Sequence, residues 1–349
     1  MSDQPLRAAI IGCGRMGSTI DDELPRWAPS TKPYSHAARY RAVPDTQLVA
    51  ACDADEGKLS TFGERWGITG LYSDVAEMMR REQPDIVSIC THTAIRHEVA
   101  LQVIAGRPRA IFLEKPLAET LRQCGDIVRG CQEHGIVSAV NASRRWEPAW
   151  TRAKELVAAD VIGPLQCIMA FCGGGLSHMG SHLLDLVRYL ADDAPVEWVS
   201  GQVPGLEGTD DERDHAGLGL LQFAGPIHAY VNMIDTRAVG VDVTLLGAEG
   251  RIQIGDNGNT RQLWVNNEAG LERRYLGEIP FPDPYDMPGM GTMSVLDIAQ
   301  CVRQGGKARC AAEDGCAALE LALALRQSER TGARVALPYE NLDEAIKSP

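Results

Sequence analysis

Short apolar runs alternate with longer amphipathic stretches over the first 140 residues. Between the apolar runs, apolar positions recur at helical spacing, and the runs themselves are apolar at nearly every position, as in strands covered on both faces. The predicted strands are residues 7–11, 47–52, 85–90, 110–113 and 136–140, and the predicted helices are 56–66, 75–82, 96–105 and 121–134. This alternation predicts βαβ units and hence a doubly wound parallel sheet.

The pattern changes from about residue 147. Two helices are predicted, at residues 149–159 and 181–190, on either side of a glycine-rich loop. Strand-like runs separated by turn residues follow at 196–201, 217–223, 227–234, 241–246, 251–254 and 262–265, and a last helix is predicted from residue 313 to about 327. Such a series is typical of a mostly antiparallel sheet with a few helices.

Composition narrows the class of protein. The chain has 349 residues, which suggests two domains, and a net charge of −13, which opposes binding to nucleic acid or to an anionic membrane. It has no apolar run of the ~18 residues that span a bilayer and no signal-peptide pattern at its start. None of its ten cysteines forms C-x-x-C. We therefore expect a soluble cytoplasmic protein with reduced thiols.

A glycine motif directly follows the first predicted strand and is expected to open a helix. Gly12 permits a tight turn, Gly14 lets the backbone approach a pyrophosphate, and Gly17 allows close packing of helix on strand. Free N–H groups and the helix dipole then favour the anion. The motif predicts a dinucleotide site, with the intervening residues Cys13, Arg15 and Met16 also beside the cofactor.

Asp53 follows the second strand, where an acidic residue can accept hydrogen bonds from the adenosine ribose hydroxyls. Its charge would repel a 2′-phosphate, so we expect NAD rather than NADP. Asp53 lies 36 residues beyond Gly17, against the usual ~20. An insertion at residues 21–33 explains the excess, either as a lid over the site or as a passive surface loop.

Polar residues follow the later strands at the sheet edge where ligands bind. Thr91 and His92 are expected on the cofactor side, together with Glu114. Lys115 follows a buried strand and precedes a proline, so it could point into a cleft and stabilise developing alkoxide charge. The alternative is a surface lysine paired with Glu114. Asn141 and Arg145 follow the fifth strand as candidate substrate contacts.

A glycine-rich stretch at residues 173–185 carries two histidines. If the helix begins near His178, then His178, His182 and Asp185 share one face. A helix N-terminus favours the neutral imidazole, which can act as a general base. The H-x-x-x-H spacing also resembles half of a metal site, but no further ligand stands at a recognisable spacing, so we expect no metal.

The sequences IIGCGRMG at 10–17, ACD at 51–53, EKP at 114–116 and GGGLSHMGSHLLD at 173–185 together resemble the glucose–fructose oxidoreductase / inositol dehydrogenase / MocA (Gfo/Idh/MocA) family. The resemblance spans nearly the whole chain. It implies an N-terminal Rossmann domain at residues 1–125, with core strands to about 141. It also implies a C-terminal α/β domain at 126–349 with a large open sheet, and a homo-oligomer (a dimer or tetramer).

The same resemblance assigns the catalytic lysine to Lys115 and the catalytic histidine to His182. The lysine would polarise the reacting oxygen, and the histidine would take the hydroxyl proton. His178 stands where the family commonly has an aspartate, so it is a further catalytic or substrate-binding candidate, with Met179 beside it. The sequence Thr91-His92-Thr93 and the insertion also depart from the family pattern.

We therefore expect an NAD-dependent dehydrogenase that acts on a secondary hydroxyl of a sugar, glycoside or cyclitol. One alternative is an enzyme that oxidises a sugar transiently, eliminates a neighbouring group and recycles its NAD, as a glycosidase or lyase. Another is a non-enzymatic NAD-sensing regulator, against which the presence of both Lys115 and His182 argues.

Overall fold

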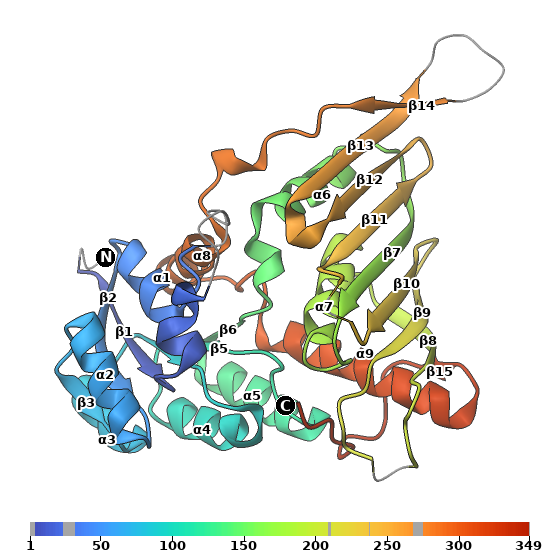
Figure 1. Cartoon of the computed structure of the whole chain (residues 1–349). Coiled ribbons are helices and arrows are strands. Elements are labelled where there is room, and N and C mark those ends of the chain that lie inside the picture. Colours follow the sequence, from blue (N-terminus) through green and yellow to red (C-terminus); the bar gives the residue numbers. More distant parts are fainter. Residues whose placement is uncertain (1–3, 24–31, 209–210, 237, 268–274, 349) are drawn as a thin grey trace. The chain divides into compact units, whose positions relative to one another are not determined.

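The computed structural model describes residues 4–23, 32–208, 211–236, 238–267 and 275–348 (Figure 1). The chain divides into two compact units. The first unit contains Met1–Glu147 and Met287–Cys316, and the second contains Pro148–Asp286 and Ala317–Pro349. The expected domain boundary after residue 125 lies inside the first unit, because the last strand of that unit's sheet comes after it.

A six-stranded parallel sheet forms the core of the first unit, in the order β3-β2-β1-β4-β5-β6. This is the order of doubly wound dinucleotide-binding sheets, so the predicted fold class is confirmed. The strands are β1 (Leu6–Ile11), β2 (Thr46–Cys52), β3 (Gly70–Tyr72), β4 (Ile86–Ile89), β5 (Ala110–Leu113) and β6 (Val137–Val140). The predicted apolar runs coincide with all of them except the short edge strand β3, which was missed.

The helices of the first unit are α1 (His36–Ala42), α2 (Glu56–Trp66), α3 (Val75–Glu82), α4 (Thr93–Ala105), α5 (Leu121–His134) and α8 (Met290–Gln304). Asp55, Asp74 and Thr120 cap α2, α3 and α5, because their side chains accept hydrogen bonds from N–H groups of the first turn. The predicted spans of these three helices are confirmed. Helices α1 and α8 were not predicted.

The turn after β1 corrects the expectation of one helix opening at the glycine motif. A π-helical turn, η1 (Arg15–Thr19), is followed by a 3₁₀ turn, η2 (Ile20–Asp22). The next α-helix, α1, begins only at His36. The interruption coincides with the insertion expected at residues 21–33.

Asp21 joins the two ends of this insertion. Its carboxylate accepts hydrogen bonds from the backbone N–H groups of Tyr34 and Ser35, both at 2.7 Å. Ser35 in turn caps α1. Residues 24–31 lie outside the described residues, so the choice between a lid and a passive loop stays a prediction.

A nine-stranded sheet forms the second unit, in the order β14-β13-β12-β11-β7-β10-β9-β8-β15. It is antiparallel except for the β7–β10 pair, as the sequence predicts. Its strands are β7 (Leu165–Gly173), β8 (Val196–Gln202), β9 (Gly217–Phe223), β10 (His228–Ile234), β11 (Asp242–Gly247), β12 (Gly250–Gly255), β13 (Thr260–Asn267), β14 (Tyr275–Ile279) and β15 (Val335–Ala336). Strands β7, β14 and β15 were not predicted.

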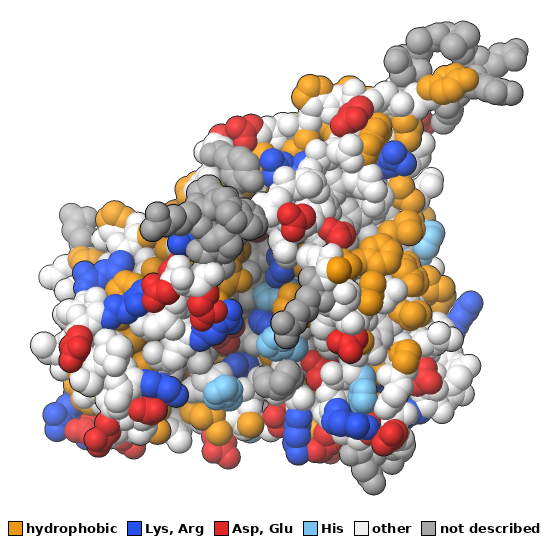
Figure 2. Space-filling view, in the orientation of Figure 1, with side chains coloured by type: hydrophobic (Ala, Val, Ile, Leu, Met, Phe, Trp, Pro, Cys, Tyr) orange, Lys and Arg blue, Asp and Glu red, His pale blue; other side chains and the backbone are white. Residues whose placement is uncertain are grey.

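The two faces of this sheet differ. The helices of the second unit are α6 (Pro148–Ala158), α7 (Gly180–Leu190) and α9 (Ala312–Thr331). The first residues of α9, up to Cys316, belong to the first unit. Leu325 of α9 packs against Gly201 and Gly219, while α7 contacts β7 and β10. Residues of the other face, among them Met169 and Leu220, are exposed. Hydrophobic side chains gather over this sheet in Figure 2.

Candidate active site

The parallel sheet of the first unit brings most of the predicted cofactor residues to its carboxyl edge. Gly12 to Gly14 follow β1, Asp53 follows β2, and Thr91 with His92 follows β4. Glu114 and Lys115 follow β5, and Asn141 follows β6. These segments were predicted separately from the sequence, and parallel pairing places all of them at one edge.

The glycine loop fits a dinucleotide phosphate. Gly12 has φ +95°, and a Cβ there would lie 2.8 Å from the carbonyl carbon of Cys90. A Cβ on Gly17 would lie 2.1 Å from the backbone oxygen of Gly12. Gly14 differs, because no described atom outside Gly14 and its two chain neighbours lies within 4 Å of the Cβ position. The loop is therefore closely packed on its protein side and open at Gly14, as the approach of a pyrophosphate requires.

Asp53 is tied to this loop. Its carboxylate accepts hydrogen bonds from the backbone N–H groups of Cys13, at 2.7 Å, and Asp55, at 2.9 Å. The side chain is half-buried, and each carboxylate oxygen can accept more than one hydrogen bond. Arg15, in the same loop, pairs with Glu23 at 2.7 Å and is exposed.

Arg96 links two of the segments that follow strands of the parallel sheet. It was not among the site residues predicted from the sequence. Its buried guanidinium donates to the backbone oxygens of Thr91 and Pro116. The Thr91 hydroxyl is buried without a hydrogen-bond partner among the described residues, so a polar group of a bound cofactor would satisfy it. His92 is exposed and immediately precedes α4.

Glu114 lies at the centre of a buried polar network. Its Oε1 accepts a hydrogen bond from Asn141 Nδ2 at 2.6 Å and lies 3.0 Å from His36 Nε2. His36 Nδ1 lies 2.8 Å from the Ser88 hydroxyl. The His36 and Arg39 side chains are buried, and Arg39 donates to Asn141 Oδ1 at 2.8 Å. His36 was not among the residues predicted from the sequence, so its polar role was missed.

The charge states in this network follow from its contacts. Burial by itself would raise the pKa of Glu114, but the hydrogen bond and charge of His36, with further help from Asn141 and Lys115, lower it to about 2. Burial lowers the pKa of His36. A neutral His36 can donate Nε2–H to the Glu114 carboxylate while Nδ1 accepts from Ser88. Lys115 therefore follows an ionised carboxylate in the chain.

Asn141 and Arg145 are occupied by contacts within the first unit. Both side chains are buried. Arg145 lies 3.5 Å from the Asp314 carboxylate and donates to the backbone oxygen of Arg309. Their predicted contacts with substrate stay predictions.

Two histidines of the second unit, His178 and His182, lie where β7 leads into α7. The helix begins at Gly180, so His178 and Met179 lie in the preceding turn and His182 in the first helical turn. This corrects the expectation of a helix from His178. His182 and Asp185 are buried and His178 is half-buried. The His178 imidazole Nδ1 lies 3.1 Å from the Ser348 hydroxyl.

Two kinds of feature are absent from the described residues. No cluster of three or more His, Cys, Asp or Glu side chains there could hold a metal ion. None of the helices in the same ranges is long and apolar enough to cross a bilayer.

The sheet order and the glycine loop define the first unit as a dinucleotide-binding domain. Residues 6–142 match the Gfo/Idh/MocA model described as an oxidoreductase family with an NAD-binding Rossmann fold. Residues 170–337 match the model of that family's C-terminal alpha/beta domain. The chain belongs to the Gfo/Idh/MocA family, which confirms the resemblance, and is an NAD(P)-dependent oxidoreductase.

Similar proteins include two named dehydrogenases. The D-apiose dehydrogenase of Paraburkholderia graminis is 25% identical over 95% of this chain and 89% of its own length. The scyllo-inositol 2-dehydrogenase (NAD(+)) of Bacillus subtilis is 25% identical over 96% of this chain and 97% of its own. A levoglucosan dehydrogenase, solved with NADH and L-sorbose, shares the fold with a TM-score of 0.79 and 18% identity, covering 97% of this chain and 100% of its own.

The glycine loop yields a matched pair of variants. Gly17→Ala is expected to lower the free energy of unfolding by about 1–3 kcal/mol, because its methyl group would overlap the backbone oxygen of Gly12. Gly14→Ala should leave stability within ~0.5 kcal/mol but weaken NADH binding. Urea unfolding and NADH fluorescence titration measure the two effects. Equal stability of the two variants would contradict the close packing of Gly17 on the backbone of Gly12.

Glu114 predicts a pH dependence of stability. Its pKa falls from 4.5 to about 2 on folding, so its contribution is complete above pH 4.5 and is lost as the pH falls towards 2. This amounts to roughly 3 kcal/mol. The stability difference between wild type and Glu114→Gln should therefore shrink between about pH 5 and pH 2 in urea unfolding. Exposed Glu98→Gln is the control, and a constant difference for Glu114→Gln would refute the assignment.

Proposed function

We propose that this chain is an NAD-dependent dehydrogenase that transfers a hydride between a secondary hydroxyl of a sugar, glycoside or cyclitol and nicotinamide. The observation that carries the proposal is the carboxyl edge of the parallel sheet. This edge contains the glycine loop, which leaves space beside Gly14, and Lys115, which follows the ionised Glu114 in the chain. The similarity to a D-apiose and a scyllo-inositol dehydrogenase supports the substrate class.

Asp53 supports NAD as the cofactor. Two backbone N–H groups already hold its carboxylate in place, and its remaining acceptor positions suit the two hydroxyls of an adenosine ribose. A 2′-phosphate would bring negative charge towards this carboxylate. The nearby Arg15 is paired with Glu23, so its charge is already compensated.

The proposed chemistry divides between a lysine and a histidine. Nicotinamide, when bound, accepts or returns the hydride. Lys115 binds the reacting oxygen through its ammonium group and stabilises the negative charge that develops there. His182 takes the hydroxyl proton as a general base and returns it in the reverse reaction. Because Asn141 and Arg145 are engaged within the first unit, we assign further substrate contacts to His178 and Met179.

Reduced-nicotinamide absorbance tests this proposal, using purified protein, NAD or NADP, and a panel of sugars, glycosides and inositols. We expect reduction of NAD with one substrate class. Lys115→Met and His182→Ala should each lower kcat/KM by ~10²–10⁴-fold, since each removes proton-transfer or charge stabilisation. His228→Ala, at an exposed position of β10, is the matched control.

Each other outcome changes a specific part of the proposal. Activity with NADP alone would overturn the role of Asp53 and leave the chemistry intact. Full turnover by both the Lys115 and His182 variants would overturn the catalytic assignment. A converted substrate without accumulated NADH would replace the net dehydrogenase with a redox-cycling enzyme.

We also propose that the chain forms a homo-oligomer through the exposed face of the nine-stranded sheet. Met169, Leu220 and Leu276 are large hydrophobic residues on its strands, between 37% and 48% exposed. Leu220→Glu should therefore lower the mass measured by light scattering. Leu101→Glu, on α4, serves as the control because Leu101 is also exposed. A monomeric wild type, or an unchanged mass for Leu220→Glu, would overturn this proposal.

A further inference from the structure

One carboxylate holds the loop that carries His178. Asp214 Oδ1 accepts a hydrogen bond from the backbone N–H of Ser177, and Oδ2 accepts one from that of His178, both at 2.7 Å. The N–H of Leu176 donates to the backbone oxygen of His215 at 2.9 Å. Three consecutive N–H groups before α7 are therefore bound by residues 214 and 215.

The same loop is shaped to admit this carboxylate. A Cβ built on Gly175 would lie 2.5 Å from the carboxyl carbon of Asp214. Any larger side chain at Gly175 would displace Asp214 from its position. Glycine at position 175 therefore allows the close approach of Asp214.

The His178 ring has its own partner. Its Nδ1 lies 3.1 Å from the hydroxyl of Ser348, 170 positions away in sequence. The segment that carries Ser348 is itself fixed, because the backbone N–H of Lys347 donates to the backbone oxygen of Glu212 at 2.7 Å. The Lys347 ammonium also pairs with the Glu212 carboxylate, and Ile346 is buried.

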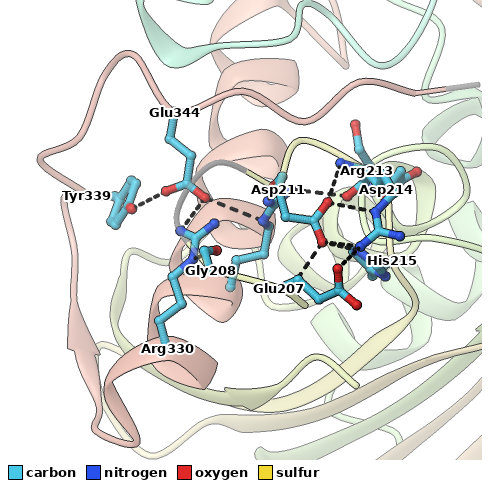
Figure 3. Close-up of polar contacts among 11 residues, drawn as sticks. Glu207, Gly208, Asp211, Arg213, Asp214, His215, Arg330, Tyr339 and Glu344 are labelled. Atoms are coloured by element: carbon cyan, nitrogen blue, oxygen red, sulfur yellow. Dashed lines mark hydrogen bonds and ion pairs between the residues drawn. The ribbon is translucent and has the colours of Figure 1, made fainter. Parts of the chain in front are cut away.

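Asp211 organises the segment that precedes Asp214 (Figure 3). Its carboxylate accepts hydrogen bonds from the backbone and side chain of Arg213 and lies 2.7 Å from His215 Nε2. The Arg213 guanidinium, with further hydrogen bonds from Glu207 N–H and His215, holds the pKa of Asp211 far below its usual range.

Helix α9 connects both segments. Arg326 donates to the backbone oxygens of Asp211 and Arg213. Glu344 lies 3.4 Å from Arg326 Nε, accepts from Arg330 at 2.6 Å and accepts from the Tyr339 hydroxyl. Figure 3 shows the Glu344 and Asp211 groups side by side. The segments that carry Asp214 and Ser348 therefore both contact α9.

We propose that Asp214 and Ser348 are positioning residues for His178. Asp214 fixes the backbone of the loop, and Ser348 fixes the imidazole through Nδ1, which orients Nε2. This inference rests on the proposed function, in which His178 contacts the substrate. It adds the segment Glu344–Ser348, whose role no sequence motif indicated, to the determinants of the reaction.

Ser348→Ala tests the ring contact in the full-length protein labelled with ¹⁵N-histidine. The ring-nitrogen shifts of His178, assigned by comparison with His178→Asn, should change in Ser348→Ala and return in Ser348→Thr. With a sugar or inositol that the wild type oxidises, kcat should fall about fivefold in Ser348→Ala and recover in Ser348→Thr, because one hydrogen bond is lost and restored. Glu340→Gln, at an exposed position nearby, is the control.

Asp214→Asn tests the backbone contact. The side-chain NH₂ of the asparagine would face one of the two loop N–H groups and could not accept its hydrogen bond. We therefore expect altered His178 ring shifts. We also expect kcat to fall about tenfold or more, with KM for NAD unchanged. Thermal unfolding of each variant checks that the fold is retained.

The spectra and the kinetics separate the two proposals. If the wild type oxidises no member of the panel, the proposed function fails, while the ring shifts still decide whether Ser348 and Asp214 hold His178. Unchanged ring shifts in both variants would overturn the positioning roles. Changed shifts with unchanged kcat would overturn their relevance to the reaction.

Discussion

A buried carboxylate at the end of β5 organises the first unit. Glu114 must be hydrogen-bonded because an ionised group removed from water is otherwise strongly destabilising. Its partners come from separate elements: Asn141 follows β6, and His36 begins α1 and connects to Ser88 of β4. The carboxylate therefore joins three parts of the unit, and Lys115 is the next residue along the chain. The fold of this unit and the position of the candidate catalytic lysine therefore both depend on the hydrogen bonds of Glu114.

Aspartates perform a related task in the irregular segments. Asp53 binds the N–H of Cys13 in the glycine loop, Asp21 closes the insertion, and Asp214 holds the loop before α7. Backbone N–H groups outside helices and sheets still need acceptors, and ionised acceptors give the stronger hydrogen bonds. Part of the acidic excess of this chain thus serves to fix loops at its candidate sites.

Sequence patterns were informative where the signal is local. Strands β4 and β5 are buried at every position and were recognised as continuous apolar runs. Helices with an Asp or Thr cap were placed correctly. Strand β7 was missed because it has few β-branched residues and runs directly into a glycine-rich loop. The histidine cluster was found, but its helix begins two residues later than expected.

The sequence by itself determined the parallel sheet, the dinucleotide loop, Asp53, Lys115 and the two histidines as candidates. These features depend on periodicity, on glycine conformation and on residues that directly follow strands. Only the tertiary structure decided that His36 meets Glu114, 78 positions away, and that Ser348 meets His178, 170 positions away. No local pattern encodes such pairs, because a buried polar side chain finds its partner only when the packing of distant elements brings the two together.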